Sequence, residues 1–121
     1  MTLKTFASAT ALLLSLSPLT IASAQSSSIE TFVFETVDSY EILSGVYQLN
    51  VTGIIQGEAA PRTIAIPPST NANTTYDVRV RSCERLALIA MSKPGQYFFE
   101  VRRGSSSVYG QPLQGCKLTR R

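Results

Sequence analysis

The chain has 121 residues and a formal net charge of +3, with 44% hydrophobic and 16% charged residues. This composition is typical of one compact globular domain and excludes a disordered chain or a coiled coil. The sequence contains no histidine and no tryptophan, which excludes serine–histidine and cysteine–histidine catalysis and every histidine-based metal site. We therefore expect neither a metal nor a cofactor.

Residues 1–24 have the pattern of a removable export signal. A short basic start precedes an apolar stretch over 6–21, and Ala22 and Ala24 supply the small side chains that signal peptidase accepts. Proline and polar residues interrupt this stretch, which is shorter than the roughly 20 apolar residues that span a membrane. We expect residues 25–121 to form a single β domain, secreted or periplasmic, with no integral membrane segment after signal removal.

The mature chain is expected to consist mainly of strands. Runs in which apolar and polar residues alternate, or in which both alternating faces are apolar, predict strands. They cover 29–37, 46–55, 62–66, 76–81, 84–91, 96–103 and 114–119. Between them we expect a turn or a single helical turn over 38–45, a polar loop over 69–75, and a turn over 104–107 followed by a short edge over 108–109.

Two of these predicted strands differ in pattern. In 76–81 the apolar residues occupy one face and the charged residues the other, so Arg79 and Arg81 are expected to share an outer strand face. The run 84–91 is apolar on both faces, which favours a central strand, and a short helix is the alternative because periodicity cannot separate the two in so short a run.

The tetrapeptide 93–96, Lys-Pro-Gly-Gln, predicts a type II turn, because proline sets its second position and glycine supplies the positive φ of its third. The strand 96–103 is then expected to run antiparallel to 84–91. About seven or eight short strands with turns between them predict an all-β fold, a small antiparallel β-sandwich. The alternative is a Greek-key barrel of the oligonucleotide- or oligosaccharide-binding type.

Cys83 and Cys116 are the only cysteines. In an oxidising compartment a lone pair in a small domain most often forms one structural disulfide. Closing a loop of this size stabilises the folded state by roughly 4 kcal/mol at most. A redox-active pair would need Cys-x-x-Cys spacing, which is absent.

Charge is divided unevenly along the chain. Residues 25–61 contain five acidic residues and no basic one: Glu30, Glu35, Asp38, Glu41 and Glu58. Every basic residue except Lys4 lies after residue 61. In one interpretation acidic and basic strands are neighbours and neutralise each other. In the other, a basic face that includes Arg79, Arg81 and Arg102 binds an anionic partner.

These observations favour an exported, non-catalytic binding or protein-interaction module with a protein or envelope partner. The first alternative is a barrel that binds an acidic polymer, either acidic polysaccharide or nucleic acid, through Arg79, Arg81 and Arg102. The second is a small carboxylate-dependent hydrolase, which would need two close carboxylates in a deep groove.

Two triplets, at 50–52 (Asn-Val-Thr) and 73–75 (Asn-Thr-Thr), match the acceptor pattern for N-glycosylation. They matter only in a eukaryotic host, and ordinary surface polarity is the alternative explanation. Asn73 is expected to be the better acceptor because it lies in the polar loop.

Signal removal gives a direct prediction. Because Ala22 and Ala24 occupy the positions that need small side chains, the exported protein should begin at Gln25. Intact-mass analysis of the exported protein checks this, and a product that retains Met1 would refute it.

Overall fold

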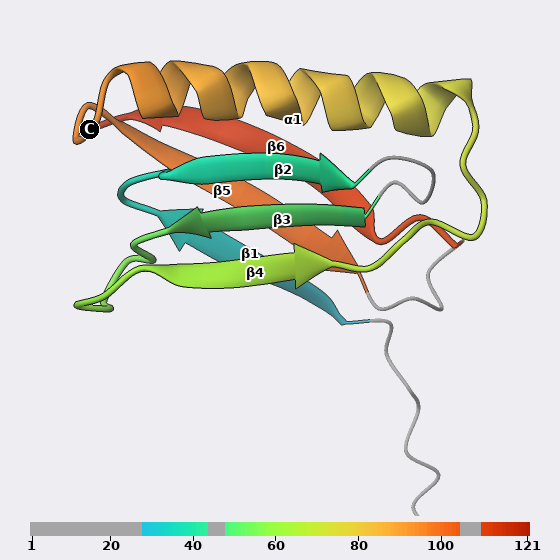
Figure 1. Cartoon of the computed structure of the whole chain (residues 1–121), viewed down its shortest axis with the longest axis horizontal. Coiled ribbons are helices and arrows are strands. Elements are labelled where there is room, and N and C mark those ends of the chain that lie inside the picture. Colours follow the sequence, from blue (N-terminus) through green and yellow to red (C-terminus); the bar gives the residue numbers. More distant parts are fainter. Residues whose placement is uncertain (1–27, 44–47, 105–109) are drawn as a thin grey trace, which may run out of the picture.

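The structure is a computed structural model that describes residues 28–43, 48–104 and 110–121, so the predicted signal lies outside the described residues. The elements in chain order are β1 (Ile29–Phe34), β2 (Ser39–Leu43), β3 (Gln48–Gly53), β4 (Arg62–Ile66), α1 (Thr74–Ser92), β5 (Tyr97–Gly104) and β6 (Leu113–Arg120). The strands form two antiparallel sheets, ordered β1-β5-β6 and β2-β3-β4. The two sheets lie one behind the other, and α1 runs along one side of them (Figure 1). The predicted all-β class with one disulfide is confirmed, and α1 is added to it.

The core lies between the inner faces of the two sheets. Leu49 and Val51 from β3 and Phe99 and Val101 from β5 are fully buried, as the alternating sequence predicts. Phe34 of β1 packs near Phe99, with ring centroids 6.3 Å apart. The alternation therefore predicts correctly which face of β3 and of β5 is buried.

At one end of the molecule the two sheets are joined through the backbone. Phe34 at the end of β1 forms an isolated bridge with Ile55, just after β3. The Glu35 amide donates to the Ile54 carbonyl at 2.7 Å. Gly53 is required at this corner, because a Cβ there would lie 2.0 Å from the carbonyl oxygen of Thr36.

On the side opposite α1, the edge strands β1 and β4 belong to different sheets (Figure 1). Arg103 of β5 connects them. Its guanidinium pairs with Glu30 of β1 and donates to the Ala65 carbonyl of β4 at 2.8 Å. It also lies over the ring of Phe32, 4.9 Å from the ring centroid. Arg103 therefore links the edge strand β1 of one sheet to the edge strand β4 of the other.

The predicted strands over 76–81 and 84–91 are wrong, since both segments belong to α1, and for 84–91 the helix alternative is correct. The buried residues of α1 recur at helical spacing: Tyr76, Val80, Cys83, Ala87 and Ala90. The Oδ1 of Asn73 caps the helix by accepting from the Tyr76 amide at 2.9 Å. The apolar residues on the exposed side of α1 obscured this period in the sequence.

Three smaller predictions have mixed outcomes. The segment 38–45 contains strand β2 in place of the expected turn. The turn at 93–96 is confirmed, with the Gln96 amide donating to the Lys93 carbonyl at 3.2 Å and Gly95 at φ 78°, but it joins a helix to a strand. Gly104 ends β5, and the rest of the predicted turn and edge over 104–109 lies outside the described residues.

The disulfide between Cys83 and Cys116 is confirmed, with Cα atoms 5.4 Å apart. It joins α1 to β6, and Cys83 is only 1% exposed. A buried disulfide fits a compartment outside the reducing cytosol.

Replacing Cys83 and Cys116 together with alanine is expected to lower the free energy of unfolding by about 2–4 kcal/mol, because the unfolded chain is no longer cross-linked. Denaturant titration of the variant and of the oxidised protein measures the difference. The reduced wild-type protein is the control and should unfold close to the variant. A variant as stable as the oxidised protein would contradict this prediction.

Candidate functional site

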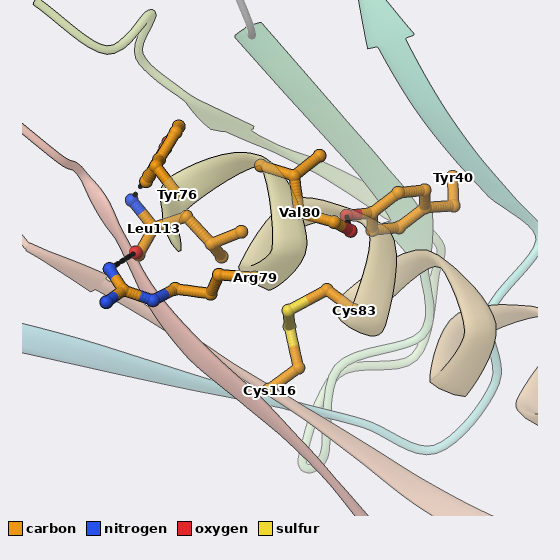
Figure 2. Close-up of a disulfide and its surroundings, with 7 residues drawn as sticks. All are labelled: Tyr40, Tyr76, Arg79, Val80, Cys83, Leu113 and Cys116. Carbon is orange, nitrogen blue, oxygen red and sulfur yellow. Dashed lines mark hydrogen bonds between the residues drawn. A yellow bond between two sulfur atoms is a disulfide. The ribbon is translucent and has the colours of Figure 1, made fainter. Parts of the chain in front are cut away.

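Helix α1 is fixed to both sheets by contacts on its inner face (Figure 2). The disulfide of Cys83 attaches it to β6. From the other sheet, the hydroxyl of Tyr40 in β2 donates to the Val80 carbonyl at 3.2 Å. Burial, with a smaller effect of the Glu84 charge, raises the pKa of Tyr40, so its hydroxyl keeps the proton that it donates. The position of α1 is therefore set from two directions.

Arg79, a predicted binding residue, belongs to this attachment. Its Nη1 donates to the Leu113 carbonyl at 3.0 Å and lies 3.4 Å from Oε1 of Gln111, as Figure 2 shows for Leu113. The guanidinium also lies 6.0 Å from the ring centroid of Tyr76. The Tyr76 hydroxyl in turn accepts from the Leu113 amide at 3.4 Å. Arg79 thus holds the start of α1 against the start of β6.

Arg81 lies on the solvent side of the helix. Its side chain is 68% exposed, and its Nε pairs with Asp77 one turn earlier at 3.0 Å. Residues two apart on a helix differ by about 200° in direction. The prediction that Arg79 and Arg81 share a face is therefore wrong, because it assumed a strand.

Arg102, the third predicted binding residue, is exposed on β5. It lies beside Gly115 of β6, where a Cβ would approach its Nη2 to 2.9 Å. No ion pair joins it to another described residue. The three arginines thus occupy three surfaces: beneath α1, on its solvent side, and on the β1-β5-β6 sheet. Whether Arg102 binds a ligand stays a prediction.

The carboxylates of the described residues pair with arginines at four places. These pairs are Glu30 with Arg103, Glu35 with Arg121, Glu58 with Arg62, and Asp77 with Arg81. The first three join the acidic half of the chain to the basic half, and the first two do so between residues far apart in the sequence, as the neutralising interpretation of the charge division expects. The exposed ion pairs contribute little stability, about 0–1 kcal/mol each.

The outer face of α1, defined here as Val78, Arg81, Arg85, Leu88 and Ile89, is a feature that the strand assignment missed. Val78 is 57% exposed, Leu88 55% and Ile89 41%. Helical spacing places these residues opposite the buried set, with Arg85 at the centre of the face. Arg85 is exposed and forms no ion pair with another described residue. Two features of the sequence together could have revealed this face: Asn73 as a helix-capping residue, and the helical spacing of Tyr76, Val80, Cys83 and Ala87 after it.

Residues 28–43, 48–104 and 110–121 contain no cluster of three or more histidine, cysteine, aspartate or glutamate residues able to hold a metal ion. Within them, no helix has the length and apolar character needed to cross a membrane. Comparison with known protein families, curated proteins and solved structures finds no significant match to this chain.

The different positions of Arg79 and Arg81 predict different effects on stability. Arg79→Gln should lower the free energy of unfolding by about 1–2 kcal/mol, because it removes hydrogen bonds that hold α1 to β6. Arg81→Gln should lower it by less than about 0.5 kcal/mol, because its ion pair is exposed. Denaturant titration of both variants measures this, and equal effects would contradict the assignment of Arg79 to the attachment.

Proposed function

We propose that the protein is an exported, disulfide-linked binding module that contacts another protein through the outer face of α1. The observation that carries this proposal is the exposure of Val78, Leu88 and Ile89 around Arg85 on one helix. Large aliphatic side chains that share an exposed surface are typical of interaction sites, whereas single ones are ordinary. The predicted signal and the buried disulfide support export.

The attachment of α1 suits this role. The disulfide, the Tyr40 hydrogen bond and Arg79 hold the inner face of the helix, so the outer face keeps one geometry before a partner arrives. A surface that is already ordered loses less conformational entropy on binding than a mobile one. The sandwich thus acts as the support and α1 as the contact surface.

The chemistry of the outer face indicates the kind of partner. Arg85 at its centre favours a carboxylate on the partner, and the aliphatic residues around it favour an apolar surface. A membrane surface is a poorer match, because interfacial helices usually insert aromatic residues and the only aromatic residue of α1, Tyr76, is buried. We therefore propose a protein partner with an apolar patch beside an acidic group.

The two alternative functions have less support. An acidic-polymer site would need neighbouring exposed arginines, and Arg79, Arg81 and Arg102 lie on different surfaces. A carboxylate-dependent hydrolase would need two carboxylates close together, and the paired carboxylates named above contact arginines. We propose a binding role without catalysis.

Site-specific photo-crosslinking tests this proposal in the exported protein. A photoreactive residue replaces Leu88 in one variant, and in a control variant it replaces Thr63 on the outer face of β4. We expect one discrete protein adduct from position 88 and none from position 63. Arg85→Glu should reduce the yield of that adduct about tenfold, because it places like charges together in the interface.

Arg62→Glu is the matched control for charge, since Arg62 is exposed at the start of β4, on the side of the molecule opposite α1 (Figure 1). It should leave the adduct from position 88 unchanged. Adducts of equal yield from positions 88 and 63, or no adduct from position 88, would refute the proposal that the outer face of α1 binds the partner. Salt-sensitive retention on heparin that Arg102→Gln weakens would favour the acidic-polymer alternative.

A further inference from the structure

The two N-glycosylation triplets have different settings in the fold. Asn73 directly precedes α1, and both Asn73 and Thr75 are exposed. Asn50 lies in β3, the central strand of the β2-β3-β4 sheet, and is half-buried. A glycan is a bulky hydrophilic group that requires an open surface position.

At Asn73 the cap leaves the attachment atom available. Its Oδ1 accepts from the Tyr76 amide at 2.9 Å, whereas a glycan is attached through Nδ2. Among the described residues nothing hydrogen-bonds to Nδ2 of Asn73 or to the hydroxyl of Thr75. Glycosylation therefore preserves the hydrogen bond that starts α1.

The loop before Asn73 is held in place by the chain before β6. The Thr70 amide donates to the Gly110 carbonyl at 2.9 Å, and the Ser69 hydroxyl donates to the same oxygen at 2.6 Å. Nε2 of Gln111 donates to the Asn71 carbonyl at 3.0 Å. These bonds hold the loop against the chain before β6, and Asn73 at the end of the loop is exposed.

At Asn50 the attachment atom is already in use. Its Nδ2 donates to Oε2 of Glu41 on the neighbouring strand at 3.1 Å. Register places Asn50 between Glu41 and Ala65, so a glycan there would have to cross the outer face of the sheet. The hydroxyl of Thr52, the third residue of this triplet, lies 2.7 Å from that of Thr63.

We propose that Asn73 is an N-glycosylation site in a eukaryotic secretory pathway and that Asn50 is not. The proposal rests on the export proposed above. A glycan at Asn73 would project from the N-terminal end of α1. Leu88 and Ile89 lie about 22–24 Å farther along the helix at 1.5 Å per residue, so the glycan leaves that part of the outer face open.

The test is expression of the full chain with its own leader in a yeast secretory host, followed by intact-mass analysis before and after peptide-N-glycosidase treatment. This enzyme converts a glycosylated asparagine to aspartate, so peptide mass spectrometry then localises the site. We expect the glycan on Asn73 alone. Thr75→Ala should abolish it without altering the cap, and Thr75→Ser should retain it because serine preserves the acceptor pattern.

Asn73→Asp separates the glycan from the cap. Aspartate keeps an oxygen that can accept from the Tyr76 amide, so the variant should lose the glycan and remain folded. Asn50→Gln should leave the glycan in place. A glycan that survives Thr75→Ala, or that Asn50→Gln removes, would overturn the proposal.

Unglycosylated protein in the medium would also overturn the assignment of Asn73, while leaving the proposed export intact. Protein that stays inside the cell with its leader attached would refute export itself, and the assignment of Asn73 with it. The two failures are therefore distinguishable in one expression experiment.

Discussion

The bond between Cys83 and Cys116 attaches α1 covalently to β6, and a large part of the interior depends on the position of that helix. Two three-stranded sheets are too narrow to enclose a core by themselves, so the side between β2 and β6 needs a cover (Figure 1). The inner residues of α1 fill this side, and Tyr76 is fully buried there. A domain of this size has little stability in reserve, which gives a covalent attachment of its single described helix particular weight.

Much of the β-structure could be predicted from the sequence. In β3 and β5 the alternation has a clear buried face, and β4 ends at a proline pair, so pattern and turn chemistry agree. The segment of α1 could not be assigned in this way. Tyr76 and Val80 are four residues apart, a spacing that fits both a strand and a helix. Val78 between them makes the run alternate like a strand, although in the helix Val78 lies on the side opposite Tyr76 and Val80. Exposed aliphatic residues made a surface helix look like a buried strand.

The same error decided how well the functional residues could be predicted. Cys83 and Cys116 were identifiable because their pairing follows from compartment and count and does not depend on secondary structure. The grouping of Arg79 with Arg81 depended on a strand, and the helix sends one to β6 and the other to solvent. Arg85, Leu88 and Ile89 had no pattern of their own until the helix placed them on one face. Charge neutralisation between the two halves was one of two interpretations that the sequence left open, and the pairing of β1 with β5, which brings Glu30 beside Arg103, favours it.

Arg103 bears on how the molecule behaves toward copies of itself. An edge strand presents unpaired backbone groups that another chain can extend into a larger sheet. The Arg103 guanidinium already donates a hydrogen bond to the Ala65 carbonyl. A strand approaching β4 would therefore have to displace this charged group and break its ion pair with Glu30. On the opposite side of the sandwich, α1 covers the remaining edges (Figure 1). The β4 edge is therefore poorly suited to pair with a strand from another copy of the chain.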